Sequence, residues 1–362
     1  MRRPFAISIS SVLALTILPV IAESDPYLAR AREAVPQEAA VDTTLTRLLR
    51  YPDIHGDRIA FVYAGDIWTV AASGGTAQRL TSHEGLELYP KFSPDGRWVA
   101  FSAEYDGTRQ VHVIPAEGGT PKQLTFYNDV GPMPPRGGTD YRIYGWTPDG
   151  SHVVFRANRL PHGARLGRPY QVPVAGGLET PLAVPESGGA DLSPDGRRLA
   201  FTPKDREFRT WKRYRGGRAQ DVWVFDLEAL SARQLTDLPA TDNQPVWVNE
   251  TIYFASDRDW KLNLYAVSPE GGEARKVTFH EEYDVLWPSG GPGGVVYENG
   301  GWIWHFDPAT EQTAWVPIRV AGDLPYTRPQ MTNVSEGIQS ASIGPTGSRA
   351  VFEARGELFT VP

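Results

Sequence analysis

The chain has 362 residues, a formal net charge of −7 and no cysteine. The lack of cysteine excludes disulfides, thiolate catalysis and cysteine-ligated zinc or iron–sulfur clusters, and the negative charge disfavours nucleic acid as a partner. The chain also contains 36 glycines and 31 prolines, and 11% of its residues are aromatic. Many turn formers between residues of high strand propensity indicate a long series of short strands.

The first 22 residues have the pattern of a secretory signal peptide. Arg2 and Arg3 precede an apolar run over residues 5–21, and Ala22 is a small residue at a cleavage point. The run is short for a membrane-spanning helix. We predict a signal peptide over residues 1–22, a periplasmic or secreted protein, and no stable membrane insertion after signal removal. An uncleaved membrane anchor is the alternative. Residues 23–50 are predicted to form a linker.

An internal repeat is the most informative feature of the chain. Residues 93–101, which begin with Ser-Pro-Asp-Gly, return almost unchanged at residues 193–201, and weaker copies occupy residues 147–155 and 344–352. Asp-Gly suits a tight hairpin, because glycine accepts a positive φ at no steric cost. A strand–turn–strand unit that recurs every few tens of residues is typical of a β-propeller.

A second marker is a polar strand that ends in Leu-Thr or Val-Thr, usually after a Gly-Gly pair. Its copies end at Thr81, Thr125, Thr236 and Thr278. By both markers, six repeats begin near Ile54, Tyr89, Ile143, Ala190, Pro245 and Trp287. Their mean length of about 44 residues is that of a four-stranded blade. We therefore predict an all-β fold, with a six-bladed β-propeller of four-stranded antiparallel blades over residues 51–318.

The composition changes after residue 318. Residues 319–333 contain Pro325 and Pro329 and are predicted to form a connector. Residues 334–362 hold a further copy that stops after its second hairpin arm. We interpret them as the first strands of a second propeller, truncated at Pro362. The alternative is that they close a seven-bladed ring by pairing with strands near Ile54.

A search for catalytic and metal-binding motifs finds none. The seven histidines lack metal-ligand spacing, no Gly-x-Ser-x-Gly elbow occurs, and the Gly-Gly pairs open no phosphate-binding helix. We therefore predict no catalytic residue, no metal and no cofactor. His112 and His305 alternate with apolar strand residues, so we interpret them as satisfied histidines of the core or of a blade interface.

The insertion over residues 204–220 combines seven cations with three aromatic side chains. Such a segment suits an anionic group, such as a peptide carboxylate or an acidic protein face. The residues predicted to contact a peptide or a partner protein are Arg209, Trp211, Lys212, Arg213 and Arg215. The alternative is a solvated loop with Trp211 packed on a blade. Single-stranded nucleic acid is a third reading, which the acidic chain and its predicted export disfavour.

Three stretches together resemble the N-terminal propeller of the tricorn protease family. They are residues 48–57 with 61–68, residues 207–217 and residues 334–341. The resemblance implies a six-bladed propeller, a seven-bladed propeller, a PDZ-like domain and a C-terminal serine peptidase domain in one chain that degrades peptides. It also implies a homo-oligomer, since some members form hexamers. The family's catalytic serine and histidine lie downstream of position 362, so no catalytic role transfers to a residue here.

The hypothesis that follows is a peptide-gating and assembly module that has no peptidase activity by itself. The signal-like N-terminus indicates export, whereas the family prototype is cytosolic, so a cytoplasmic location is the alternative. The rival function is a free-standing periplasmic interaction propeller of the Tol–Pal type, which shares the Ser-Pro-Asp-Gly turn. A third class, an enzyme with its site in the central channel, is disfavoured because the sequence shows no repeated polar set.

Overall fold

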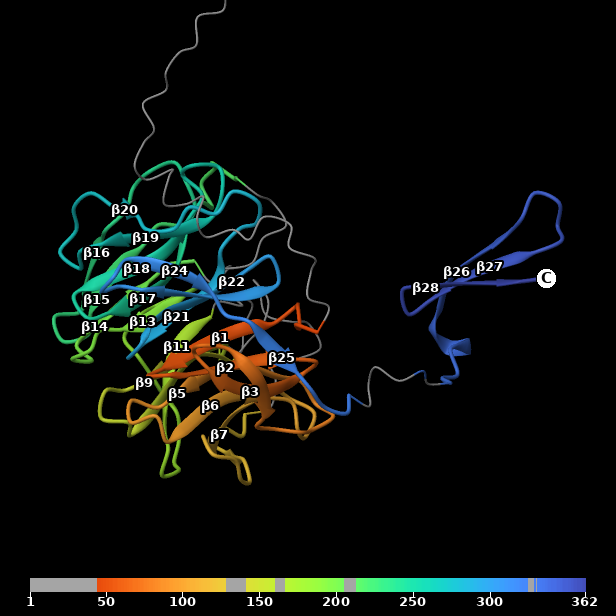
Figure 1. Ribbon diagram of the computed structural model, residues 1–362, viewed down its shortest axis with the longest axis horizontal. Coiled ribbons are helices and arrows are strands. Elements are labelled where there is room, and N and C mark those ends of the chain that lie inside the picture. The colour runs from red at the N-terminus through yellow and green to blue at the C-terminus, as the bar shows by residue number, and fades with distance from the viewer. Residues whose placement is uncertain (1–43, 128–140, 160–166, 205–212, 325–328, 330) are drawn as a thin grey trace, which may run out of the picture.

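The computed structural model describes residues 44–127, 141–159, 167–204, 213–324, 329 and 331–362. In this part of the chain, strands make six sheets of four consecutive antiparallel strands each, the first joined by a fifth strand, and one separate three-stranded sheet. The first strands of neighbouring sheets contact one another in a closed circle, β1–β5–β9–β13–β17–β21 and back to β1. The six sheets are therefore the blades of a β-propeller, arranged around these inner strands (Figure 1).

The strands follow one another in blade order. The first three blades are β1 (Arg50–His55), β2 (Arg58–Tyr63), β3 (Asp66–Ala71) and β4 (Gly75–Arg79); β5 (Glu87–Phe92), β6 (Trp98–Ala103), β7 (Gln110–Pro115) and β8 (Lys122–Gln123); and β9 (Arg142–Trp146), β10 (His152–Ala157), β11 (Arg168–Pro173) and β12 (Thr180–Pro181). The next three are β13 (Ala190–Leu192), β14 (Arg198–Phe201), β15 (Trp223–Asp226) and β16 (Ser231–Gln234); β17 (Asp242–Val248), β18 (Thr251–Ser256), β19 (Asn263–Val267) and β20 (Arg275–Lys276); and β21 (Leu286–Gly291), β22 (Gly294–Asn299), β23 (Trp302–Asp307) and β24 (Gln312–Trp315). The strand β25 (Ile318–Val320), the short 3-10 helix η2 (Ser335–Gly337), β26 (Ile338–Ile343), β27 (Ala350–Ala354) and β28 (Glu357–Val361) follow.

The Pro-Asp-Gly repeats form the turns between the first and second strands of their blades. In the second blade, the Asp95 carboxylate accepts hydrogen bonds from Ser93 Oγ at 2.6 Å and from the Arg97 amide at 3.1 Å. These bonds lower the pKa of Asp95 to about 2. Gly96 follows with a φ of +69°, the left-handed conformation that favours glycine. The predicted hairpin turn is confirmed.

The threonine of the Leu-Thr marker makes two hydrogen bonds inside the blade that carries it. Its Oγ1 accepts a hydrogen bond from an amide of the blade's third strand, as in Ile67 to Thr81 at 2.8 Å and Leu264 to Thr278 at 2.8 Å. The same hydroxyl donates to a buried side chain, which is Glu87 for Thr81. The marker recurs because a buried amide and a buried side chain both need a partner where the chain leaves a blade.

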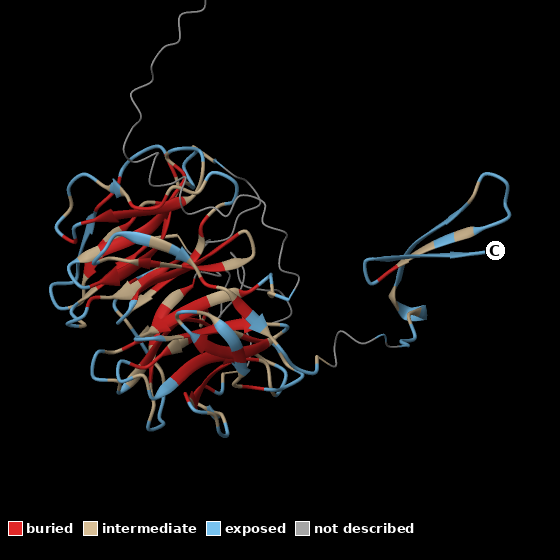
Figure 2. Cartoon of the chain, in the orientation of Figure 1, coloured by how far each residue is buried: buried red, intermediate tan, exposed pale blue. Residues whose placement is uncertain are grey.

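The hydrophobic core lies between blades rather than within one. One cluster joins Val111 and Val113 of the second blade to Val153 and Phe155 of the third. The second strands, such as β2 and β22, are buried almost throughout (Figure 2). Since neighbouring blades cover both faces of these strands, apolar residues follow one another in them without alternation, as over residues 59–62 and 295–297.

The ring closes between the first and the sixth blade. Leu49 and Phe61 pack in one buried cluster with Val296 and Ile303 of the sixth blade and with Ile318. Ile318 begins β25, which pairs in parallel with β4 of the first blade. The chain therefore returns to the outer edge of the blade in which it began, as β25 does beside the first blade in Figure 1.

This closure corrects the expected propeller boundaries. Leu49 is fully buried and β1 begins at Arg50, so the end of the expected linker belongs to the first blade. At the other end β25 extends to Val320, two residues into the expected connector. Both corrections have the same cause, because the segments on either side of the ring bury apolar side chains in a shared cluster.

The last three strands form a sheet of their own. β26, β27 and β28 pair only with one another in the described registers, and their residues are mostly exposed. Figure 1 shows this sheet apart from the propeller. Ile54 pairs with Ile59 of β2, so this sheet does not close a seven-bladed ring near Ile54, as the alternative required. The closing strand is β25.

We expect Gly96→Ala to destabilise the protein more than Gly150→Ala. Both glycines have a φ of +69°, so alanine costs about 1–2 kcal/mol at either position. A Cβ at Gly96 would also lie 2.6 Å from the His55 ring, whereas at Gly150 the nearest atom is 3.9 Å away. Chemical unfolding should give a further loss of about 1 kcal/mol or more for Gly96→Ala. Equal losses would contradict this account.

Candidate functional site

The described part of the basic insertion is attached to the fifth blade. The Arg215 guanidinium pairs with Asp257 at 2.6 Å, donates to the Asp257 carbonyl at 2.9 Å and lies 4.8 Å from the Trp260 ring centre. Arg213 Nε donates to the Trp260 carbonyl at 2.5 Å. The charge of Arg215 is thus already partnered. The other predicted contact residues, Arg209, Trp211 and Lys212, lie outside the described residues, so contact of this segment with a peptide or partner stays a prediction.

A bulge recurs in the inner strands where four blades face the central axis. The pairing register of β1, β5, β17 and β21 shifts at the same relative position. Each shift contains a residue with positive φ followed by proline, and these residues are Tyr51 (50°), Tyr89 (56°), Gln244 (52°) and Trp287 (50°). A bulge re-aims a side chain, and a positive φ is rare for bulky residues. The inner strands are thus bent to present large side chains to the axis.

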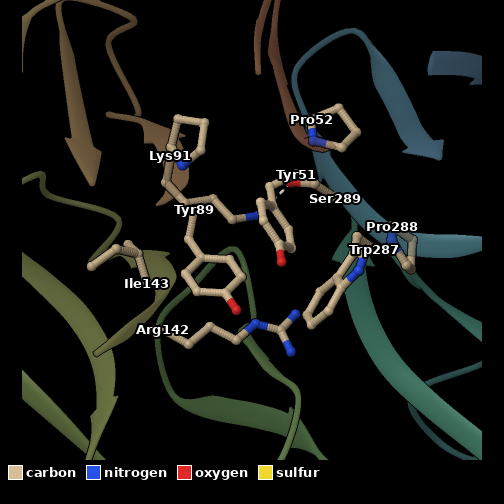
Figure 3. A pocket seen from close by; sticks show the side chains of 10 residues that line it. Tyr51, Pro52, Tyr89, Lys91, Arg142, Ile143, Trp287, Pro288 and Ser289 are labelled. Atoms are coloured by element: carbon tan, nitrogen blue, oxygen red, sulfur yellow. Dashed lines mark hydrogen bonds between the residues drawn. The ribbon is translucent and has the colours of Figure 1, made fainter. Parts of the chain in front are cut away.

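Three of these side chains meet in one aromatic cluster. The ring centres of Tyr51 and Tyr89 are 4.5 Å apart, those of Tyr51 and Trp287 4.9 Å, and those of Tyr89 and Trp287 5.7 Å. The Arg142 guanidinium, from β9, lies 5.0 Å from the Trp287 ring centre and 6.0 Å from that of Tyr89. Figure 3 shows the four side chains directed toward a common space. We call this space the central pocket; its volume is about 20 Å³, enough for one water molecule.

Burial governs the electrostatics of the central pocket. Arg142 is only 9% exposed, and the loss of water around its charge lowers its pKa to about 10. Burial, together with the neighbouring Tyr89, raises the pKa of the Tyr51 hydroxyl. The Tyr51 hydroxyl therefore keeps its hydrogen across the physiological pH range.

A second cation, Lys91, lines the same pocket two residues after Tyr89 on β5. Its Nζ lies 3.3 Å from Asp53 Oδ1 and donates to Ser289 Oγ, and the Ser289 hydroxyl donates to Asp53. Asp53 also accepts from the Phe92 amide at 2.7 Å. The carboxylate of Asp53 thus balances Lys91 and joins the first, second and sixth blades below the aromatic cluster.

Two buried polar side chains hold the aromatic residues in place. Glu298 Oε1 accepts from the Tyr51 amide at 2.6 Å, while its Oε2 pairs with Arg50 Nε at 2.8 Å. Gln244 Oε1 accepts from the Trp287 amide at 2.8 Å. Burial of Glu298 raises its pKa to about 7. The backbone of Tyr51 in the first blade and that of Trp287 in the sixth blade are therefore each held by a buried side chain of a neighbouring blade.

The sequence analysis did not identify the residues of the central pocket, because the residue types at matching positions differ from blade to blade. The positions that follow the bulge hold Asp53, Lys91 and Ser289, and the matching position of the fourth blade holds Asp191. Asp191 accepts from the Trp247 amide at 2.7 Å, and its burial raises its pKa to about 7. The signal that could have identified the site is the repeated pair of a large residue and proline, as in Tyr51-Pro52 and Tyr89-Pro90.

Among the described residues, no group of three or more histidine or acidic side chains is placed to hold a metal ion. His112, one of the two histidines interpreted as core or blade-interface residues, is buried, stacks on Phe101, and has its ring centre 4.6 Å from that of Tyr105. No helix within the described ranges is long and apolar enough to cross a bilayer.

Comparison with known proteins identifies the family. The profile of the tricorn protease N-terminal beta propeller domain matches residues 46–312. The chain belongs to the tricorn protease family. The propeller described above is that N-terminal domain, in agreement with the resemblance of residues 48–57 with 61–68 and of residues 207–217.

Individual relatives support the same family assignment. Tricorn protease homolog 1 of Streptomyces coelicolor is 29% identical over 315 residues, covering 86% of this chain and 28% of the relative. The crystal structure of the tricorn protease superposes with a TM-score of 0.72 at 25% identity, covering 87% of this chain and 30% of that one. This chain spans less than a third of either. A TolB structure from Agrobacterium tumefaciens matches with a TM-score of 0.51 at 20% identity, covering 64% of this chain and 80% of that one, and shows the fold alone.

We expect Glu298 to make the stability of the protein depend on pH. Its pKa in the folded protein, about 7, lies above its ordinary value of 4.5. Folding therefore favours the protonated form, and stability present below pH 4.5 is lost as the pH rises through 7. Glu298→Gln keeps an acceptor for the Tyr51 amide but cannot ionise. Between pH 5 and 8 the wild type should lose roughly 1–3 kcal/mol relative to this variant.

Asp149→Asn is the matched control for this measurement. Hydrogen bonds in its turn lower the pKa of Asp149 to about 2, so it does not titrate between pH 5 and 8. The free energy of unfolding of this variant should run parallel to that of the wild type. A parallel profile for Glu298→Gln as well would show that Glu298 is ionised throughout.

Proposed function

We propose that this chain is the propeller region of an exported tricorn-like serine peptidase, in which it binds and gates peptides and contributes no catalytic residue. The observation that carries the proposal is the match of residues 46–312 to the N-terminal propeller domain of the family. The length comparison supports it, because the chain spans only 28% of a full-length relative. The serine peptidase activity belongs, on this proposal, to domains downstream of residue 362.

The propeller itself supports a binding role. Its inner strands hold strained aromatic residues and a buried arginine around the axis, and strain of this kind concentrates at functional sites. On this proposal peptides or partner proteins are the ligands, and the propeller also serves assembly into a homo-oligomer, with the hexamer as the form expected from the family. No observation favours a Tol–Pal type function, since the TolB likeness concerns the fold alone.

We expect the native protein to be larger than this chain. Its intact mass, measured on protein from the envelope fraction of the source cell, should lie well above 40.0 kDa. The purified 362-residue chain should show no hydrolysis of peptides above a buffer blank. A native species of about 38 kDa, the size after loss of a short signal peptide, would contradict the proposal, as would peptidase activity that survives controls for contamination.

Export is part of the proposal. Residues 1–22 lie outside the described residues, and the support comes from their charged start, apolar run and Ala22. We expect N-terminal sequencing of the native protein to begin at Glu23, and the protein to be released from cells by osmotic shock. Replacing Arg2 and Arg3 by glutamate should retain a longer, unprocessed form. A native chain that begins at Met1 and stays in the cytosol would place the protein with the cytosolic prototype.

A further inference from the structure

The sixth blade packs on its two neighbours through opposite faces of the same strands. Val296 of β22 and Ile303 of β23 belong to the cluster that closes the ring against the first blade. The next residues along these strands, Tyr297 and Trp304, belong to a different cluster, which is shared with the fifth blade. Side chains alternate between the two faces of a strand. The sixth blade therefore makes two separate contacts, one with each neighbour.

A histidine lies in the contact between the fifth and the sixth blade. His280 belongs to the connection from β20 to β21, and its Nε2 lies 2.9 Å from the Tyr297 hydroxyl. Its ring centre is 5.6 Å from that of Tyr297 and 4.7 Å from that of Trp304. Its amide donates to Asn263 Oδ1 of β19 at 2.8 Å. The contact thus contains a side chain whose charge can change near neutral pH.

The surroundings of His280 do not balance a charged imidazole. The groups that face it are Asn263 of β19, Tyr297 of β22 and Trp304 of β23, and none of these carries a charge. The charged residues of its own segment are exposed or bonded elsewhere; they are Lys276, which pairs with Asp259, Glu281, Glu282, and Asp284, which accepts from the Leu262 amide. Burial lowers the pKa of His280 to about 4. The closed contact therefore requires the neutral ring.

The hydrogen bonds of this contact also favour the neutral ring. Tyr297 is fully buried, so its hydroxyl hydrogen needs an acceptor, and a neutral His280 ring supplies one at Nε2. A charged ring carries a hydrogen on both nitrogens and accepts at neither. Trp304 Nε1 is buried and has no hydrogen-bond partner among the described residues. A second unpaired donor in the same cluster would add a further cost.

We propose that His280 is an acid-sensitive switch, whose protonation reversibly releases the sixth blade from the fifth. The contact is fully formed above pH 6.5, the ordinary pKa of histidine, and weakens as the pH falls toward 4. Glu298 has the opposite effect on the contact with the first blade, because its raised pKa of about 7 favours closure as the pH falls. The pH therefore decides which face of the sixth blade is held more weakly. This inference goes beyond the proposed function and needs neither a peptide nor a peptidase domain.

Hydrogen exchange of the intact chain, measured by mass spectrometry, tests the switch. Exchange is followed at pH 5 and at pH 7.5, with labelling times scaled to equal intrinsic exchange. Peptides that cover β22 and β23 report on the sixth blade, and peptides that cover β6 and β7 are the internal reference. The measured quantity is the ratio of the exchange rate at pH 5 to that at pH 7.5. Protection of β22 and β23 should return when the sample is brought back to pH 7.5.

Comparison with His280→Gln isolates the histidine, because Glu298 is common to both proteins. The glutamine can accept from the Tyr297 hydroxyl but takes up no proton, so the ratio for β22 and β23 should be roughly tenfold larger in the wild type. His305→Gln is the matched control and should keep the wild-type ratio. His305 follows Trp304 on β23 and donates from Nε2 to the Gly293 carbonyl at 2.6 Å, a bond that a charged ring retains. If His280→Gln does not fold, His280→Asn takes its place.

Three results would overturn the proposal. They are equal ratios for β22 and β23 in the wild type and the folded His280 variant, a difference between these two proteins that is as large in β6 and β7 as in the sixth blade, and protection that does not return at pH 7.5. The last result would show acid denaturation instead of a switch. None of them bears on the peptidase proposal, which intact mass and cleavage assays test separately.

Discussion

The contact between the first and the sixth blade is the interaction on which the propeller depends. Each blade is covered by its neighbours, so an open ring would expose two blade faces of core residues. The closure buries Leu49, Phe61 and Ile303 in one cluster and adds β25 to the edge of β4. Glycine is required in the loop that follows β21, because a Cβ at Gly293 would meet the Gly56 carbonyl oxygen. Both ends of the propeller segment are thus held by the same contact.

The closure also shapes the central pocket. Glu298 of the sixth blade binds the Tyr51 amide of the first, and Asp53 of the first blade accepts from Ser289 of the sixth. These contacts bring Tyr51 and Trp287, 236 positions apart in the chain, to a ring separation of 4.9 Å. The geometry of the pocket is therefore a consequence of ring closure, and a change that loosens the closure is expected to disturb both together.

The propeller separates two kinds of charged side chain. Surface cations such as Arg215 are paired with nearby acids and anchor loops to blades. At the axis, Arg142 is buried among aromatic rings, Asp53 pairs with Lys91, and Asp191 accepts a hydrogen bond from the Trp247 amide. Membership in the tricorn protease family explains the blade architecture.

The sequence by itself determined the blade count, the hairpin turns and the family. These features depend on local contacts. Asp95 and Gly96 shape a turn within a few residues, and Thr81 accepts a hydrogen bond from the Ile67 amide fourteen positions away. Only the tertiary structure decided how the ring closes and which residues meet at its axis. Tyr51, Tyr89, Arg142 and Trp287 lie on four different blades. Three of them precede a proline, but this local pair does not show that the four side chains meet. Their proximity follows from the circular packing of the blades, which brings distant positions of the chain together.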